Sequence, residues 1–322
     1  MKKTTLKEIA VEAGVSAMTV SNVVHGKTEK VSADTIEKVS VLLKKYNYTI
    51  NQNAAGLRGA KSRLIGLVYY SRENNIKFSN PFVARVLSGI EQVAKTNGYF
   101  VMVHAISKLD DLTLLQSNWK FAGFIAVGVT SEVFKRFDDL IQVPVCYIDA
   151  QVNDQDVDFI KHSFVQIDER SATQKLTSYV NALGHEHIAF VSYHFKDDTK
   201  SVLTERYKGY CDIVSKPVLI MVEEAEVPSM SDLPEEITAI VASSDTLALL
   251  LLNRFPEISV VGHDDIPMLN FINPGLTTVK IHQKTKGRIA LSLLLELVDG
   301  NMGRVETLAT ELVKRESVKK LS

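Results

Sequence analysis

The sequence predicts an α/β protein in three parts: an N-terminal three-helix head that contains a helix-turn-helix, and two doubly wound lobes built on parallel sheets. Two capped amphipathic segments separated by a glycine turn occupy residues 5–25, and strand-like and helix-like segments alternate from residue 64 onwards. The length of 322 residues also exceeds that of one typical domain. We therefore expect a head over residues 1–50, a hinge helix and linker over 51–63, and the two lobes over 64–322.

The predicted helix-turn-helix begins at a capping box. Thr5 and Glu8 have the spacing at which each side chain bonds the other's backbone N–H, and Gly14 suits a left-handed cap at the end of this first helix. Ser16 then caps a second helix, with Thr19 at its third position. Apolar residues recur at helical spacing in both segments, at Leu6, Ile9, Ala10, Ala13, Val15, Val20, Val23 and Val24. An ordinary helical hairpin shares this pattern and is the alternative interpretation.

The outer face of the second helix favours contact with DNA. Its residues are small or hydrogen-bonding and include no acid, which suits a groove lined by phosphates, and the amide of Asn22 can bond N6 and N7 of adenine. Residues 1–63 carry 11 Lys and Arg against 5 Asp and Glu, a net charge of +6 in a chain of net charge −1, although local charge fluctuation is an alternative explanation. We predict that the head binds double-stranded DNA through Thr5, Ser16, Ala17, Met18, Thr19, Ser21 and Asn22.

The rest of the head and the segment after it are shorter elements. Ser32 caps a third predicted helix, and Tyr46 and Tyr48 at its end are expected to close the core of the head rather than to stack on bases. The next segment, N-Q-N-A-A-G-L-R at residues 51–58, is too short for a stable isolated helix, since such helices need about 12–15 residues. Gly56 weakens it further. This segment is either a switch that folds on a partner or a plain linker.

Strands and helices alternate through the remaining chain, as expected for parallel sheets with crossover helices. In the first lobe the predicted strands span 64–70, 99–104, 123–127 and 143–149, with helices between them. In the second lobe the predicted helices span 170–183, 201–214 and 245–254, and the strands span 187–192, 218–222, 239–242 and 259–262. A helix at 284–298 and a last strand near 310–313 suggest that the chain crosses between the lobes more than once.

Polar residues follow several of the predicted strands, at Tyr70, Asp149, Ser244, Asp245 and His263-Asp264-Asp265. Ligands of such sheets bind beyond the carboxyl ends of the strands, and two lobes can place those ends across a cleft. Asp245 directly precedes T-L-A-L-L-L-L, so a helix cap and a ligand contact explain it equally well. No helix begins directly after Asp149 or Asp264, which favours a ligand role for these two.

Signals of an enzyme, a metal site or a membrane protein are weak. The chain has no P-loop, no G-x-G-x-x-G at a strand end and no G-x-S-x-G elbow, and no nucleophile can be assigned to His263-Asp264-Asp265. Neighbouring side chains of His185-Glu186-His187 face opposite ways on a strand, so no metal is expected. Cys146 and Cys211 lack metal-ligand spacing and are expected in the core. With no signal peptide and no apolar run of about 18 residues, we expect a cytoplasmic protein without a cofactor.

Motifs along nearly the whole chain share one resemblance. They are T-L-K-E-I-A-V-E-A-G-V-S-A-M-T-V-S-N-V-V-H-G, V-S-A-D-T-I-E-K-V and N-Y-T-I-N-Q-N-A-A-G-L-R in the head and linker, and L-I-G-L-V, N-P-F, G-H-E-H-I-A-F-V, R-Y-K-G-Y, S-S-D-T-L-A, V-V-G-H-D-D, P-G-L-T-T-V and L-V-K-R-E-S in the lobes. On these residues the chain resembles the lactose repressor/galactose repressor (LacI/GalR) family of transcription factors.

The resemblance implies lobes similar to those of periplasmic sugar-binding proteins, a homodimer on a pseudo-palindromic operator, and a hinge helix that places Leu57 in the minor groove. It also implies a small carbohydrate effector, which the matching motifs assign to Asp149, Arg206, Ser244 and Asp264; the strand-end argument adds Tyr70. The implied function is repression of carbohydrate-utilisation genes. The alternatives are a cytoplasmic sugar-binding protein, which the basic head disfavours, and a sugar-processing enzyme.

The chain departs from the family pattern in several places. Gly56 stands where family members usually carry a larger residue, and His263 stands where an aromatic residue commonly precedes the Asp pair. Residues 223–238 contain two prolines and leave little room for the usual crossover helix, and residues 107–120 are also short. Because no tetramerisation tail follows Lys314-Arg315-Glu316-Ser317, we expect a dimer.

Overall fold

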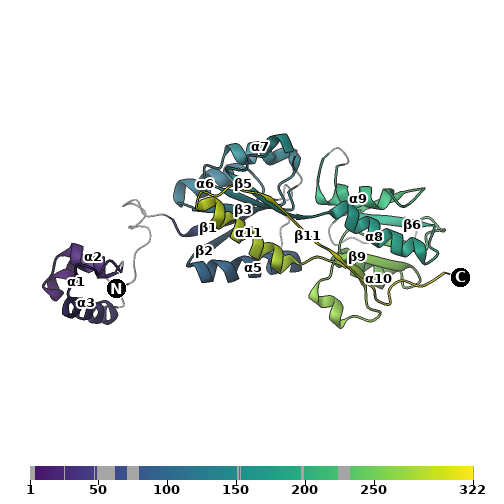
Figure 1. Ribbon diagram of the computed structural model, residues 1–322. Helices are drawn as coiled ribbons and strands as arrows, with labels where there is room; N and C mark the ends of the chain where they lie inside the picture. The colour runs from purple at the N-terminus through teal and green to yellow at the C-terminus, as the bar shows by residue number, and fades with distance from the viewer. Residues whose placement is uncertain are drawn as a thin grey trace. The chain divides into compact units, whose positions relative to one another are not determined.

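The computed structural model describes residues 4–24, 26–46, 48, 62–70, 80–150, 152, 154–196, 199–223 and 233–321. The chain divides into two compact units, Met1–Ser62 and Arg63–Ser322. Figure 1 shows the first unit as a small helical head and the second as two α/β lobes. The predicted hinge helix at 51–58, with Gly56 and Leu57, lies outside the described residues.

The head contains the predicted helix-turn-helix. Helix α1 (Leu6–Ala13) begins at a complete capping box, in which Thr5 Oγ1 accepts from the Glu8 N–H at 3.3 Å and the Thr5 N–H donates to Glu8 Oε2 at 2.7 Å. It ends at Gly14, whose φ of 70° is the left-handed cap conformation. Ser16 Oγ accepts from the Thr19 N–H at 3.0 Å, so α2 (Ala17–Val24) begins as expected.

A single apolar cluster joins α1 and α2 to α3 (Ala33–Lys45). Its fully buried members include Ile9 and Val20 from the helix-turn-helix and Val39 from α3. Tyr46 and Tyr48 pack against this cluster, which confirms that they belong to the core. The Tyr46 hydroxyl also donates to a carboxylate oxygen of Glu12, tying the end of α3 to α1.

The first lobe is a six-stranded parallel sheet with the strand order β11-β5-β4-β3-β1-β2. Its strands are β1 (Leu64–Tyr70), β2 (Phe100–Ile106), β3 (Gly123–Val127), β4 (Val145–Ile148), β5 (His162–Ile167) and β11 (Val305–Leu308). Helices α5 (Pro81–Asn97) and α11 (Gln283–Val298) cover one face and α6 (Asp110–Asn118) and α7 (Ser131–Asp139) the other, each with its own apolar cluster (Figure 1). A sheet with helices on both faces matches the doubly wound prediction.

The second lobe repeats this plan with the strand order β12-β10-β9-β8-β6-β7, in which only β12 runs antiparallel to its neighbour. Its strands are β6 (Ile188–Tyr193), β7 (Val218–Val222), β8 (Ala239–Ala242), β9 (Ser259–Asp264), β10 (Thr277–Lys280) and β12 (Glu311–Val313). Helices α8 (Glu169–Ala182) and α9 (Val202–Cys211) pack on one face and α10 (Asp245–Arg254) on the other. Short 3₁₀ turns span Asp154–Asp156 and Pro267–Phe271.

The chain crosses between the lobes three times: from β5 to α8, from β10 to α11, and from β11 to β12. The prediction of more than one crossing is therefore confirmed. The sequence pattern missed β5, β10 and β11, because short strands with polar residues, such as V-E-T-L in β11, are defined by their pairing partners more than by their composition. Among the described residues between β7 and β8, 233–238 form no helix, in line with the expected trimming there.

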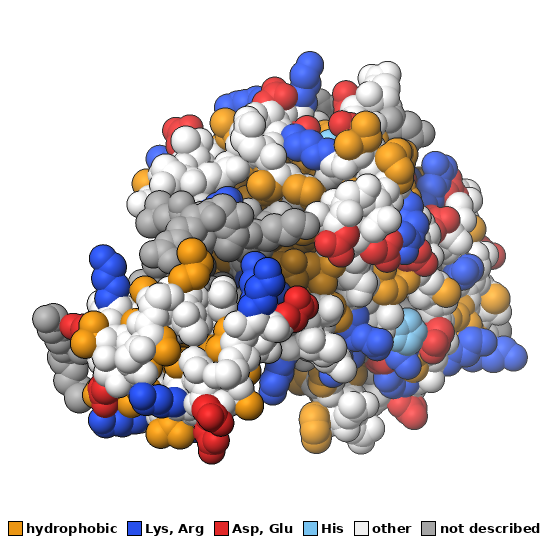
Figure 2. Space-filling model, turned by 60° about the vertical axis from the view of Figure 1, so that its left-hand side comes forward, with side chains coloured by type: hydrophobic (Ala, Val, Ile, Leu, Met, Phe, Trp, Pro, Cys, Tyr) orange, Lys and Arg blue, Asp and Glu red, His pale blue; other side chains and the backbone are white. Residues whose placement is uncertain are grey.

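Both cysteines contact apolar clusters, as the sequence predicts. Cys146 is buried in the first lobe, and Cys211 packs against a cluster of the second. Charged side chains of both signs are spread over the face shown in Figure 2. Across the described part of the chain, no helix has the length and apolar character needed to cross a membrane.

Two glycines allow α5 and α11 to cross in close contact. A Cβ built on Gly89 of α5 would overlap the backbone carbonyl oxygen of Lys284, and one built on Gly287 of α11 would overlap that of Val86. Real Cβ atoms do not approach backbone oxygens this closely, so each helix occupies the space that a side chain on the other would need. The crossing fixes the first turns of α11 against the first lobe.

We expect Gly89→Ala to destabilise the protein by about 1–3 kcal/mol, because overpacking forces the helices apart. Helix propensity alone predicts the opposite sign, a gain of up to ~1 kcal/mol. Urea unfolding of both proteins measures the difference. Ser88→Ala, at the exposed neighbouring position of the same helix, is the control and should change stability by less than ~0.5 kcal/mol. A stabilised Gly89→Ala protein would contradict the close crossing.

Candidate functional site

A cavity of about 460 Å³ lies between the two lobes, beyond the carboxyl ends of strands from both sheets. Its size is within the ~300–1,000 Å³ range of small-molecule sites, and its position is the one that parallel sheets favour. Strand ends supply much of its wall: Val127, Asp149, Tyr193, Val222, Ser243 and Asp264. The remaining lining residues are Asn80, Phe82, Gly128, Glu169, His194, Val202, Leu203, Arg206, Glu223, Ser244, Thr246, Ile266, Ile281 and Lys286.

The structure brings four of the five predicted effector residues to this cavity: Asp149, Arg206, Ser244 and Asp264. Tyr70, the fifth, is not among the lining residues; its side chain packs against the apolar cluster beneath α6 and α7. Contact of each residue with an effector remains a prediction.

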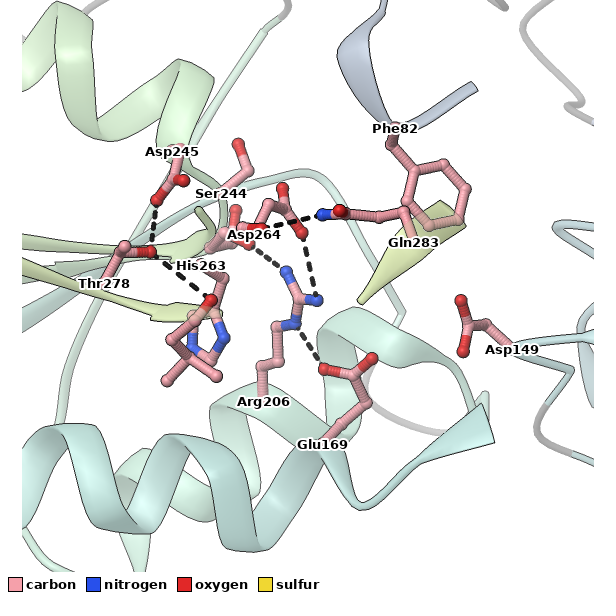
Figure 3. Close-up of polar contacts among 12 residues, drawn as sticks. Phe82, Asp149, Glu169, Arg206, Ser244, Asp245, His263, Asp264, Thr278 and Gln283 are labelled. Carbon is pink, nitrogen blue, oxygen red and sulfur yellow. Dashed lines mark hydrogen bonds and ion pairs between the residues drawn. The ribbon is translucent and has the colours of Figure 1, made fainter. Parts of the chain in front are cut away.

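Arg206 of α9 contacts three other elements of the second lobe beside the cavity. It is only 6% exposed, and its Nε donates to Glu169 Oε2 at 2.7 Å while its Nη1 donates to the backbone oxygen of Ser243 at 2.5 Å. Its Nη2 lies 3.8 Å from Asp264 Oδ1. Figure 3 shows the guanidinium between the two carboxylates. A buried guanidinium requires such partners, so Arg206 holds α8, α9, β8 and β9 around the cavity.

Lys286 forms the corresponding pair in the first lobe. Its side chain is fully buried, and its Nζ donates to both carboxylate oxygens of Asp149 at 2.7 Å. The ammonium also lies 5.9 Å from the centre of the Phe82 ring, within the range of a cation–π interaction. Because Lys286 lies in the first turn of α11, its ammonium group contacts the Asp149 carboxylate.

Sequence reasoning missed Glu169, Lys286 and Phe82. Glu169 follows β5, a strand that was not predicted, so its strand-end position went unnoticed. Lys286 resembles an ordinary solvent-exposed lysine of a helix. Phe82 belongs to the N-P-F motif, which supports the family resemblance but does not indicate what the Phe82 side chain does.

The backbone is strained at three aspartates in or beside the cavity. Asp149, Asp264 and Asp265 have φ values of 55°, 120° and 51°, in a region that residues other than glycine rarely adopt. Gln283 of α11 donates from its Nε2 to the Asp264 carbonyl oxygen at 2.7 Å, which helps to hold this conformation (Figure 3). Such strain clusters at binding sites, where surrounding structure maintains it.

Asp245 proves to be neither the cap nor a lining residue. Its carboxylate is buried and accepts from the Ile266 N–H at 3.0 Å and from Thr278 Oγ1 at 2.6 Å, so it ties the loop after β9 to β10. Burial raises its pKa well above the ordinary value. The cap of α10 is Ser244, whose Oγ accepts from the Leu247 N–H at 3.3 Å while the residue lines the cavity.

One histidine of each histidine motif has structural partners. His263 is buried with its Nε2 3.2 Å from Thr173 Oγ1, and burial followed by the charge of Arg206 lowers its pKa well below the ordinary value. His185 pairs with Thr238 Oγ1 at 2.9 Å and with the Lys319 carbonyl oxygen at 2.8 Å. Within the described ranges, no group of three or more His, Cys, Asp and Glu side chains is arranged to hold a metal ion.

The predicted DNA-contacting face lies on and before α2. Met18 is 71% exposed and Ser16 is exposed, whereas Ala17, Thr19, Ser21 and Asn22 are partly exposed. Val20 faces inward with no exposed surface. Thr5 and Ser16 use their side-chain oxygens as helix caps, and Leu57 lies outside the described residues. The structure thus presents the predicted face to solvent, while its contact with DNA remains a prediction.

Comparison with known proteins matches both units. Residues 5–51 match the model of the bacterial regulatory proteins of the lacI family, and residues 177–318 match that of a periplasmic binding protein-like domain. The chain belongs to the LacI family. The family consists of DNA-binding transcriptional regulators, so the chain is a regulator and not an enzyme.

Relatives of this LacI-family chain share its full architecture. The HTH-type transcriptional regulator KdgR of Bacillus subtilis (strain 168) is 27% identical, with 96% of this chain and 95% of that protein covered. The Lac repressor dimer bound to operator and the anti-inducer ONPF superposes with a TM-score of 0.80 at 24% identity, covering 98% of this chain and 99% of that one. The complex of the regulator CelR with cellobiose has a TM-score of 0.69 at 22% identity, covering 98% and 99%. These structures confirm the three-helix head and two-lobed fold.

Replacing the Asp264 carboxylate should stabilise this LacI-family protein at neutral pH. Burial, partly offset by Arg206, raises the pKa of Asp264 from 3.8 to about 6. The folded state therefore binds the proton more tightly than the unfolded state, and its stability falls as pH rises from about 4 to about 6. Asp264→Asn removes this penalty and keeps a residue that tolerates positive φ.

The expected stability gain of Asp264→Asn grows from pH 4 to pH 7.5 by up to about 3 kcal/mol. Urea unfolding of both proteins at pH 4, 6 and 7.5 measures it. The difference between the two proteins matters, because other carboxylates titrate in both. A difference that is constant or shrinks with pH would show that burial does not penalise this carboxylate.

Proposed function

We propose that the chain is a cytoplasmic, homodimeric repressor of carbohydrate-utilisation genes, controlled by a small sugar in the cavity between its lobes. The observation that carries this proposal is the cavity itself, in which carboxylates and a guanidinium from both lobes surround a ligand-sized volume. Such groups suit a polyhydroxylated ligand, because each forms charge-assisted hydrogen bonds to hydroxyls. The Asp264 carboxylate lies 3.8 Å from Arg206, beyond hydrogen-bond distance, and retains capacity to accept them.

A sugar in this position would act by shifting a conformational equilibrium. It would contact both lobes at once, and therefore stabilise the lobe arrangement in which all its contacts form. The shift in operator affinity equals the difference in sugar affinity between the two arrangements. The complex of the relative CelR with cellobiose supports a sugar as the ligand class.

The head would supply DNA recognition. The net charge of +6 over residues 1–63 provides a salt-dependent attraction to phosphates, and α2 would place Asn22 and its neighbours against base edges of the major groove. Two heads of a homodimer match a pseudo-palindromic site. Leu57 of the linker would enter the minor groove between the half-sites.

Asn22→Ala should relax base preference at one position in each half-site. If the Asn22 amide bonds adenine, its loss costs about 1–3 kcal/mol at that position and leaves the other positions unchanged. Selection from a random DNA library by the wild-type and variant dimers measures this preference. Val41→Ala, an exposed change on α3, is the control. Identical consensus sites for wild type and Asn22→Ala would exclude base reading by this residue.

Asp264→Asn should also reduce the response to sugar. Losing charge-assisted hydrogen bonds of about 1.5–3 kcal/mol weakens sugar binding by at least about tenfold. Operator binding by gel shift, titrated with a panel of mono- and disaccharides, measures the sugar concentration at half response in either direction of regulation. Asp265→Asn is a matched control, since Asp265 also has positive φ but pairs with Arg315 at 2.7 Å and does not line the cavity. An equal response in wild type and Asp264→Asn would remove Asp264 from the site.

A further inference from the structure

The two buried cations at the cavity are already neutralised. Arg206 is paired with Glu169, and Lys286 is held by both oxygens of Asp149 at 2.7 Å. Each partner carboxylate is nearly or fully buried with its cation, so neither cation is available to a new anion without leaving a carboxylate unpaired.

The remaining charge at the cavity is negative. The described lining residues include four carboxylates, from Asp149, Glu169, Glu223 and Asp264, against the two cations of Arg206 and Lys286. His194 at the rim lies 3.4 Å from Glu223 and is half exposed. Asp264 faces the cavity and shares Arg206 with Glu169, at 3.8 Å from the guanidinium, so the two carboxylates outnumber this one cation and the cavity attracts hydroxyl and ammonium donors and repels acidic groups.

An unpartnered hydroxyl points to the same ligand chemistry. Ser243 is fully buried and lines the cavity, and its Oγ has no hydrogen-bond partner among the described residues. Buried polar atoms normally have a partner, and this oxygen has almost no exposed surface, so a ligand would reach it once the hydroxyl turns towards the cavity. As a hydroxyl, it can donate to or accept from a sugar hydroxyl.

Lys286 cannot move away from Asp149 to reach a different anion. The crossing of α5 and α11 at Gly89 and Gly287 leaves no space for a helix shift, and the lysine side chain has no exposed surface. The ammonium also lies over the Phe82 ring. Its charge is therefore available to a ligand only when the charge of Asp149 is removed.

We propose that the cavity selects against anionic effectors, accepting neutral or amine-bearing sugars, and that the Asp149–Lys286 pair is the determinant of this selection. The proposal rests on the proposed function, because it concerns the charge of a sugar bound in the same cavity. A sugar carboxylate or phosphate entering the cavity would face Asp264 and two occupied cations. Replacing Asp149 should shift the selectivity towards acidic sugars, and replacing Lys286 should shift it towards amine-bearing sugars.

The test compares sugars that share one skeleton and differ in charge. D-glucose, D-glucosamine and D-glucuronate form one set, D-galactose, D-galactosamine and D-galacturonate a second, and D-ribose with ribose 5-phosphate completes the panel. Isothermal titration calorimetry gives the affinity of the full-length wild type for each. We expect any sugar that binds to do so at least about tenfold more tightly than its acidic counterpart.

Two single variants and their combination then isolate the pair. Asp149→Asn frees the ammonium and should shift the acidic-to-neutral affinity ratio at least about tenfold towards the acid. Lys286→Gln frees the carboxylate and should shift the amine-to-neutral ratio at least about tenfold towards the amine. The double variant Asp149→Asn/Lys286→Gln should show neither gain. A purely structural role of the pair would weaken all ligands together in both single variants.

The outcomes separate this proposal from the one it rests on. Binding of no sugar of any charge by the wild type would overturn the proposed function, and this inference with it. Preferential binding of an acidic sugar by the wild type would overturn the charge selection alone. If Asp149→Asn does not fold, Lys286→Gln still decides the matter, since an unchanged amine-to-neutral ratio in that variant would overturn the role of the pair.

Discussion

Because the Arg206 guanidinium is buried, it requires an anion beside it, and several elements of the second lobe supply its partners. The guanidinium is buried and contacts Glu169 at the start of α8, the carbonyl oxygen after β8, and Asp264 at the end of β9. Removing water from a charge is costly unless charged and hydrogen-bonding partners replace it. The same contacts that satisfy Arg206 therefore fix the positions of the strand ends from which a ligand would be bound.

Asp264 carries two features that lower the stability of the folded protein. Its backbone adopts a φ of 120°, and burial raises its pKa to about 6. The positive φ and the burial of the carboxylate both reduce the free energy of unfolding, and neither is needed to hold the sheet together. We propose that hydroxyl groups of a ligand bind this carboxylate; the lower stability would then be an example of a binding site that sacrifices stability for function.

The first turn of α11 is one of the places where a side chain links the lobes. Gln283 reaches the backbone of Asp264 in the second lobe, and Lys286, one turn later on the same helix, holds Asp149 in the first. Because β10 leads directly into this turn, it is also one of the three crossings of the chain. A change in the angle between the lobes would alter the Gln283–Asp264 contact, whereas the Lys286–Asp149 pair lies within the first lobe.

The sequence by itself determined the local features of this protein: the capping box at Thr5, the glycine stop at Gly14, the core positions of Tyr46 and Tyr48, and most lobe elements, since these depend on neighbours within a few residues. It also placed Asp149, Arg206, Ser244 and Asp264 at the cavity, because strand ends and family motifs are readable along the chain. Only the tertiary structure decided that Lys286, 137 residues from Asp149, neutralises it, that Glu169 pairs with Arg206, and that the Tyr70 side chain packs against the apolar cluster beneath α6 and α7. Such pairings depend on which helix packs on which sheet, and the spacing of residues along the chain does not specify this.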